Sequence, residues 1–423
     1  MDKKGFVYLT LFIWSQFYSV AHAGDKWAII LSGGYDLKNN HYRYYKNTVE
    51  MFSALREAGI KRDKITTLYA DGETKGVDTT KANPWTLYFT KSEIDTPASL
   101  VGDSYRDIKQ SATRQGISAT FDDLAKKVKD GDHLVFFVTD HGSKYDGITL
   151  WNGESYSVSD LESQLAKLPS GVSVHLATNI CYGGQLLRLT KNNVCVVTNT
   201  DDQKVTYSNP NDDPFATGLA SGLKNRTNKT NGGVRFIDAF QSGKSNDLSS
   251  NGTHLTSVDY FIENQRLNIS PQDCIACQCQ NISPLERLQR EIAEISEHLS
   301  KVTDKRKPYY EKYLKDRITK LSGSLDSYRN RYSNYVRGNY QKELDRLKGQ
   351  WEALSERDKQ RLRPYYTGLA EKLRAEDEYQ RKKLDDAEGD HKRALAELKF
   401  LRYASPSQLE QYYNIRKCLE YEI

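Results

Sequence analysis

The sequence predicts an α/β fold with a mainly parallel sheet flanked by helices, followed by an all-α helical bundle or coiled coil. Up to about residue 261, short apolar runs alternate with amphipathic segments, which is typical of a parallel sheet covered on both faces. After Pro284 the apolar residues follow a 3-4 spacing, the pattern of helices packed along a coiled-coil seam. The chain has 423 residues and is long enough for two domains or more.

Five short apolar runs predict the strands of the sheet, at 27–31, 65–69, 134–138, 172–177 and 194–198. Three segments with helical spacing of their apolar residues predict helices, at 47–58, 121–128 and 159–168. The stretch 75–117 is polar and weakly patterned, so we expect it to be an insertion or a surface loop.

The second half of the chain predicts three or four long helices. Ser283-Pro284-Leu285-Glu286 has the residue types of a helix start. Apolar and tyrosine residues at helical spacing then cover 285–302, 314–335 and 344–354, and resume at 369–373. Pro308 and Pro364 each precede two tyrosines and indicate a weak repeat of about 56 residues, with helix starts or kinks at the prolines. The alternative to a compact bundle is a spacer or an oligomerisation stalk.

The first 23 residues have the pattern of a secretory signal peptide. Lys3 and Lys4 precede an apolar run over 5–20, and Ala21-His22-Ala23 gives an A-x-A end. The alternative is an uncleaved anchor, but the run is short for a membrane span. We therefore expect cleavage after Ala23 and a secreted, periplasmic or otherwise extracytoplasmic protein, with no stable membrane span after removal of the signal.

The charge of the chain does not favour a nucleic-acid partner. The net charge is +5, and basic and acidic residues are interspersed along the sequence. A dedicated nucleic-acid binder has its basic residues clustered. The charge pattern therefore does not predict a nucleic-acid partner.

Two reactive residues each follow an apolar run, at the point where a predicted strand ends. His141 comes after the strand at 134–138, and Cys181 comes after the strand at 172–177. Functional groups of parallel sheets gather at the carboxyl ends of the strands, and a cysteine nucleophile needs a neighbouring base to form the thiolate. The pair therefore predicts a cysteine peptidase, with a peptide or protein substrate, no cofactor and no catalytic metal. The structural alternatives are a packed thiol and a histidine in a turn. We expect Cys195 to be a structural core residue inside a strand. His133 and His175 are expected to be strand residues with no special functional role.

Taken together, these segments resemble the legumain (asparaginyl endopeptidase) family of the caspase–hemoglobinase fold, over residues 24–265. The resemblance rests on the following stretches: Asp140-His141-Gly142-Ser143, Cys181 with Gly183-Gly184, Lys26-Trp27-Ala28-Ile29-Ile30, Tyr42-Arg43 before Ala58-Gly59-Ile60, Thr198-Asn199-Thr200, and Asp213-Pro214-Phe215. It implies a caspase-like sheet. Beyond the region of resemblance, the residue pattern itself predicts a cysteine-rich junction over residues 266–283 and a helical domain over residues 284–423.

The resemblance implies a role for each site residue. Cys181 would be the nucleophile and His141 the general base and acid. The backbone N–H groups of Gly142 and Cys181 would form the oxyanion hole, and a glycine lets the backbone approach an oxyanion closely. Peptide bonds would be cleaved after Asn or Asp.

The substrate pocket departs from the family pattern. Arg43 and Asp213 match two of its three members, while Asn179 stands where the family has an acidic residue. His41, with Asn40 one step away, stands where the family has an asparagine that supports the catalytic histidine, and Tyr44 replaces a family histidine. These departures favour peptide-bond cleavage over strict asparaginyl specificity, and they motivate an alternative: a non-catalytic caspase-like scaffold whose helical half binds partners.

Four further cysteines lie outside the predicted peptidase region. Cys274, Cys277 and Cys279 form a C-x-x-C-x-C cluster, and Cys418 lies near the C-terminus. Disulfides are the default in an exported chain, and one of them would tie Cys418 to the junction. Zinc held with Cys418 or His298 is the alternative. By architecture, the family resemblance also suggests that the helical half covers the active site, and self-association or autoinhibition through it is therefore expected.

Overall fold

The computed structural model describes residues 24–73, 79–80, 94–95, 107–206, 208, 213–224, 233–247, 253–265 and 306–423. The expected signal peptide at 1–23, the cysteines of the junction and the helix expected at 285–302 lie outside the described residues.

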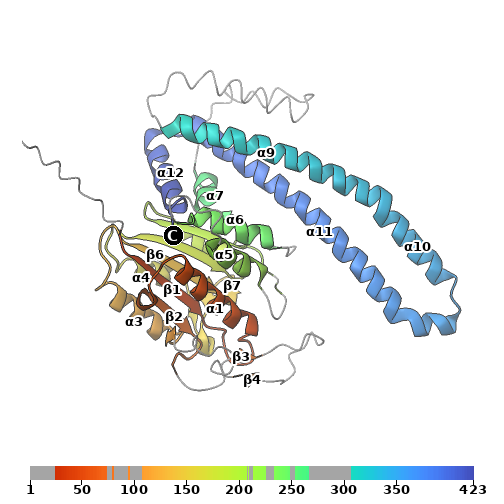
Figure 1. Cartoon of the computed structure of the whole chain (residues 1–423), viewed down its shortest axis with the longest axis horizontal. Coiled ribbons are helices and arrows are strands. Elements are labelled where there is room, and N and C mark those ends of the chain that lie inside the picture. The colour runs from red at the N-terminus through yellow and green to blue at the C-terminus, as the bar shows by residue number, and fades with distance from the viewer. Residues whose placement is uncertain are drawn as a thin grey trace, which may run out of the picture.

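A seven-stranded sheet forms the centre of the first half (Figure 1), in the order β12-β11-β10-β6-β1-β2-β5. Its strands are β1 (Lys26–Ser32), β2 (Ile65–Tyr69), β5 (Ile108–Gln110), β6 (His133–Thr139), β10 (Ser173–Asn179), β11 (Val194–Thr198) and β12 (Leu255–Thr256). All neighbouring pairs are parallel except β11 with β12. The mainly parallel sheet that the sequence predicts is thus confirmed, and its continuous apolar runs reflect burial on both faces.

Successive residues of each strand enter two separate layers. In β6, Val135 and Phe137 pack against α1 (Tyr42–Glu57), α5 (Pro214–Lys224) and α6 (Phe236–Asn246). Leu134 and Phe136 pack on the other face, against α3 (Arg114–Leu124), α4 (Val158–Leu165) and the 3-10 helix η4 (Gly183–Leu189). This alternation follows from the two-residue period of a strand.

Two minor sheets complete the first half. Strands β3 (Thr79–Thr80) and β4 (Ile94–Asp95) pair with each other. Strands β7 (Gly142–Ser143), β8 (Gly147–Thr149) and β9 (Ser155–Tyr156) form an antiparallel sheet directly after β6.

Several predicted boundaries were wrong, and the starts of two helices differ most. Helix α1 begins at Tyr42 instead of residue 47, because Tyr44 and Tyr45 are buried and extend its apolar face. The stretch expected to be a loop up to residue 117 contains β5 and the start of α3. Thr113 caps α3, since its side chain accepts a hydrogen bond from the Gly116 N–H.

The second half is helical, as predicted. Its helices are α9 (Arg306–Asn334), the π-helical turn η9 (Tyr335–Tyr340), α10 (Gln341–Glu352), α11 (Glu356–Tyr403) and α12 (Pro406–Leu419). Figure 1 shows α9 and α10 running back along α11 as a long hairpin. Leu314, Ile318 and Leu325 of the predicted apolar series are buried. Pro308 lies near the start of α9, while Pro364 lies inside α11.

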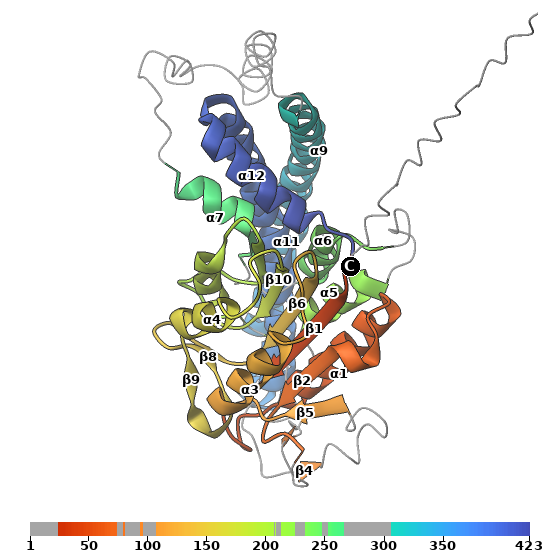
Figure 2. The ribbon, with the colours of Figure 1, turned by 90° about the vertical axis from the view of Figure 1, so that its left-hand side faces the viewer.

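The C-terminal residues pack on the sheet face that carries α1, α5 and α6. Leu398 and Phe400 of α11 and Tyr412 and Leu419 of α12 belong to that core. Helix α12 lies beside α7 (Ser257–Glu263) in both ribbon views (Figure 1, Figure 2). The backbone N–H of each of Ile423 and Val234 donates a hydrogen bond to the carbonyl of the other. The end of the chain is therefore part of the first half's core.

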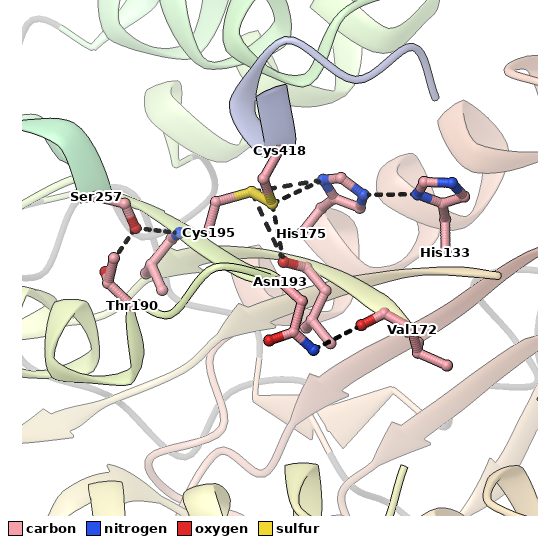
Figure 3. Close-up of a disulfide and its surroundings, with 10 residues drawn as sticks. His133, Val172, His175, Thr190, Asn193, Cys195, Ser257 and Cys418 are labelled. Carbon is pink, nitrogen blue, oxygen red and sulfur yellow. Dashed lines mark hydrogen bonds between the residues drawn. A yellow bond between two sulfur atoms is a disulfide. The ribbon is translucent and has the colours of Figure 1, made fainter. Parts of the chain in front are cut away.

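A disulfide joins Cys195 of β11 to Cys418 of α12 (Figure 3). Cys195 lies in the core inside a strand, as predicted, but its sulfur is bonded and is not a free thiol. The prediction that Cys418 pairs with the junction cysteines or binds zinc was wrong. The physical reason is the packing of α12 across the sheet, which brings together residues 223 positions apart. The apolar pattern of a strand does not predict such a long-range contact.

Candidate active site

His141 and Cys181 lie at the carboxyl ends of two neighbouring parallel strands, β6 and β10. Thr139 pairs with Asn179 at the last register position, and the Asp140 N–H donates to the Asn179 carbonyl at 3.4 Å. A Cβ on Gly142 would lie much closer to the Cys181 carbonyl oxygen than van der Waals contact allows. The structure thus brings together the three residues predicted to be catalytic, and only glycine fits at position 142.

Asp140 anchors the strand end that carries His141. Its buried carboxylate accepts hydrogen bonds from the backbone N–H of Gly33, of Gly34 at 2.9 Å and of His141 at 2.6 Å. Burial raises the pKa of Asp140 to about 7, against the opposing effect of these donors. The carboxylate ties the loop after β1 to the end of β6, so the position of His141 depends on it.

The ring of His141 is held at both nitrogens. Nε2 lies 3.0 Å from the main-chain carbonyl oxygen of Asn39, which can only accept, so we assign the proton of the neutral ring to Nε2. Nδ1 is then the acceptor, and it lies 3.2 Å from the Tyr44 hydroxyl. Nδ1 is therefore the nitrogen through which His141 can take up a proton.

Asn40 and His41, the two residues at the position of the family's supporting asparagine, contact different groups. The Asn40 side chain donates to the Tyr69 hydroxyl at 3.0 Å. The His41 ring is packed edge-on against His141, with 5.4 Å between the ring centroids. The support comes instead from the Asn39 carbonyl, a main-chain group that a comparison of side chains does not reveal.

The Cys181 thiol is half-buried and points to the loop after β11. Its Sγ lies 3.7 Å from the Thr206 carbonyl oxygen and donates to it. Among the described residues, His141 and Cys181 make no hydrogen bond with each other. Tyr182 turns the chain with a φ of 57°, and a Cβ on Gly183 would meet the hydroxyls of Thr178 and Thr198. This tight turn sets the thiol at the rim of the sheet.

Both members of the pair are neutral in this arrangement. Burial is the main cause that lowers the pKa of His141, with the charge of Arg43 as a further cause. Burial raises the pKa of the Cys181 thiol, against the smaller opposing effects of Thr206 and Arg43. Proton transfer from thiol to imidazole is therefore a step that the site must bring about.

Arg43 and Asp213, the two matched members of the predicted pocket, lie together. The Arg43 Nε is 3.7 Å from Oδ2 of Asp213. Asp213 is 2% exposed and also accepts from Asn47 at 2.7 Å and from Ser208. Arg43 Nη2 donates to the Tyr44 hydroxyl at 2.9 Å. The pair offers a donor group and an acceptor group, and the charge of Arg43 lowers the pKa of the Cys181 thiol while that of Asp213 raises it.

Asn179 is engaged in a buried network beneath this site. Its Nδ2 donates to the Thr139 hydroxyl at 3.4 Å, and its Oδ1 accepts from Asn199 at 2.9 Å. Only 3% of Asn179 is exposed. Within the described residues, its side-chain hydrogen bonds join it to β6 and to the residue that follows β11, and not to Arg43 or Asp213.

Sequence reasoning missed Asn47 as a site residue. Asn47 Nδ2 bridges Asp213 and the Thr139 hydroxyl, at 2.7 and 2.8 Å. A usable signal exists, because Asn47 lies four residues after Arg43 and so on the same face of α1.

A buried group of possible metal ligands lies between strands β10 and β11 and helix α12. His175, Cys195 and Cys418 have their ligand atoms within 4.8 Å of one another. Figure 3 shows both sulfur atoms in the disulfide, with Nδ1 of His175 3.5 Å and 3.7 Å from them. The sulfurs are bonded to each other, so this group does not hold a cation as it stands. His133 and Tyr421 stack on the same side of the sheet.

Across the described ranges, no helix is both long enough and apolar enough to cross a membrane.

Comparisons with known proteins give similarity at a low level only. No protein-family model matches the chain, and no curated protein matches it. Among solved structures, the chain is similar to caspase-1 from Spodoptera frugiperda, with 12% identity over 53% of this chain and 77% of that chain and a TM-score of 0.33. It is also similar to protein GSU0716 from Geobacter sulfurreducens, with 14% identity over 55% of this chain and 93% of that chain and a TM-score of 0.34. Similarity at this level assigns neither a family nor an activity, so the function must be inferred from the site.

Proposed function

We propose that this protein is an exported cysteine endopeptidase of the legumain kind, with Cys181 as nucleophile and His141 as base. The observation that carries the proposal is the contact of two strand ends: His141-Gly142 after β6 lies against Cys181 after β10. A cysteine and a histidine in this placement are what acyl transfer through a thioester requires.

The chemistry follows from the atoms at the site. The thiol proton passes to Nδ1 of His141, and the thiolate attacks the carbonyl carbon of the substrate. The negative oxygen then accepts hydrogen bonds from the backbone N–H groups of Gly142 and Cys181. His141 gives its proton to the leaving amine, and a water molecule hydrolyses the acyl-enzyme, with His141 as base again.

The substrate preference is proposed from the pair Arg43 and Asp213. A guanidinium donates and a carboxylate accepts, so the pair matches a side-chain amide, which has one acceptor oxygen and one donor nitrogen. Asn before the cleaved bond uses both groups. A protonated Asp also offers an acceptor and a donor, so we propose cleavage after Asn first and after Asp second.

Export is the third part of the proposal. The disulfide between Cys195 and Cys418 supports an oxidising compartment, because disulfides persist outside the reducing cytosol. The signal-like pattern at 1–23 supports the same assignment.

Hydrolysis of peptides with Asn, Asp or Ala before the cleaved bond tests the proposal. Wild type should cleave the Asn peptide fastest, and Cys181→Ala should lose all measurable cleavage. Thermal unfolding of Cys181→Ala checks that the variant keeps the fold, so that a loss of cleavage is assigned to the missing thiol, which is the free cysteine of the described residues. Unchanged hydrolysis by Cys181→Ala would show the proposal to be wrong.

A second candidate function is a non-catalytic scaffold whose helical half binds partners. It is favoured by the hydrogen bonds of the thiol to Thr206 and of Nδ1 to Tyr44, which leave the pair unconnected. A thiol-reactive peptide probe separates the two functions, because a scaffold would not react selectively at Cys181.

A further inference from the structure

A chain of hydrogen bonds connects the substrate pocket to the base through Tyr44. Arg43 Nη2 donates to the Tyr44 hydroxyl at 2.9 Å. A hydroxyl that accepts from a guanidinium has its own proton free to donate, and its neighbour is Nδ1 of His141 at 3.2 Å. Nε2 of His141 is bonded to the Asn39 carbonyl. The order of donation is therefore Arg43 to Tyr44 to His141 to Asn39.

The Tyr44 hydroxyl occupies the one lone pair that the base would use. A neutral imidazole has a single acceptor nitrogen, and here it is Nδ1. The thiol that should deliver its proton there is bonded to the Thr206 carbonyl instead. The Tyr44 side chain is 3% exposed, so water does not replace the bond at low cost.

We propose that Tyr44 is a positioning residue that holds His141 out of proton transfer until the substrate side chain engages Arg43. The proposal rests on the cysteine peptidase function proposed above. A substrate amide or carboxylate oxygen that accepts from Arg43 draws Nη2 away from Tyr44. The hydroxyl then turns from Nδ1 with its own proton, the S–H bond of Cys181 breaks, and the thiol proton forms the new Nδ1–H bond. Arg43 thereby couples recognition of the substrate to activation of the nucleophile.

Charged and titratable groups face this chain from every element around it. His41, Arg43 and Tyr44 come from α1 and its start, and Asp36, Asp140 and Asp213 come from the neighbouring loops and strand ends. Of these, Tyr44 contacts Nδ1 of His141 directly. Removing its hydroxyl takes one hydrogen bond from Nδ1 of His141 and one from Nη2 of Arg43, and the other groups around the chain keep their contacts.

Alkylation of Cys181 by iodoacetamide tests the proposal without a peptide substrate. The rate is followed by mass spectrometry of the peptide that contains Cys181, in wild type, Tyr44→Phe and Tyr45→Phe. Tyr45 is the matched control, because it is the next residue, is equally buried and stacks on Tyr69 instead of His141. At about pH 7 we expect Tyr44→Phe to react roughly three- to tenfold faster, the factor that one neutral hydrogen bond contributes, and Tyr45→Phe to react like wild type.

The pH profile separates this role from a structural one. The rate of wild type should rise with pH throughout, as for a buried thiol whose pKa is raised. The rate of Tyr44→Phe should level off near neutral pH, because His141 then shares the proton. Tyr44→Leu is a second variant, and thermal unfolding checks that both variants fold. Equal or slower alkylation in the folded variants, with the wild-type pH profile, would overturn the proposal.

Peptide hydrolysis gives an independent second readout. In Tyr44→Phe, kcat/KM for a peptide with Ala before the cleaved bond should rise relative to Asn, since Ala cannot engage Arg43. An equal fall for both peptides would contradict the coupling. If the proposed peptidase function is wrong, hydrolysis will survive in Cys181→Ala. The alkylation rates do not depend on hydrolysis, so they still test the role of Tyr44 in that case.

Discussion

Replacing Asp140 by alanine should destabilise the fold and abolish activity together. Asp140 is 3% exposed, and its carboxylate is the acceptor for three backbone N–H groups, those of Gly33, Gly34 and His141. Asp140→Ala leaves these three donors without that acceptor. A buried donor without an acceptor costs about 1–3 kcal/mol, while removal of the carboxylate relieves its own burial cost. We therefore expect a loss of about 2–5 kcal/mol in the free energy of unfolding.

The measurement is urea unfolding at about pH 8, above the pKa of about 7 of this carboxyl, so that the acceptor is ionised. Asp146→Ala is the matched control, because Asp146 is exposed in the turn after β7 and, within the part of the chain that the structure describes, its carboxylate accepts from the Ser143 hydroxyl and from no backbone N–H. That variant should change the free energy by less than about 0.5 kcal/mol. Because the loop after β1 carries the Asn39 carbonyl that orients His141, peptide hydrolysis by Asp140→Ala should fall by about a hundredfold or more. A stability loss no larger than that of Asp146→Ala would refute the anchoring role.

Three further predictions concern pH, the disulfide and the pocket. Burial lowers the pKa of His41 and of His175 to about 3, so both bind protons more tightly when unfolded. Their contribution to stability is complete above about pH 6.5 and is lost as the pH falls toward 3. The midpoint of urea unfolding should therefore be lower at pH 5 than at pH 7.5, and His175→Gln should weaken that pH dependence. Equal midpoints at the two pH values would contradict the prediction. Cys418→Ser removes a disulfide that closes a long loop and should cost about 2–5 kcal/mol, measured as a lower Tm than that of wild type; a Tm equal to that of wild type would argue against the disulfide. Arg43→Ala should lower kcat/KM for Asn peptides by about tenfold or more with little change for Ala peptides, whereas an equal loss for both would remove Arg43 from substrate recognition.

The sheet and the reactive pair could be predicted because they depend on local patterns. A strand buried on both faces is a continuous apolar run, so β2 and β11 were predicted at their observed bounds. The carboxyl ends of parallel strands meet at one edge, so His141 and Cys181 follow from strand ends alone. The helix starts were less predictable, because α1 gains a turn from tyrosines that are buried only in the folded structure.

Long-range contacts could not be predicted in the same way. The disulfide depends on the path of α12 across the sheet, and the support of His141 comes from a main-chain carbonyl that has no side-chain signature. Tyr44 stood out in the sequence only as a departure from the family pattern. Its hydrogen bond to His141 arises because the start of α1 faces the end of β6, which is a property of the packing.

The central claim is that Cys181 forms a covalent acyl-enzyme with the help of His141. The most direct measurement is the intact mass of the protein, quenched in acid during hydrolysis of an ester of an acylated asparagine. We expect an added mass equal to the acyl group, located at Cys181 by peptide mapping, absent in Cys181→Ala and slow to accumulate in His141→Ala. Hydrolysis that proceeds without an adduct at Cys181, or with an adduct at another residue, would contradict the claim.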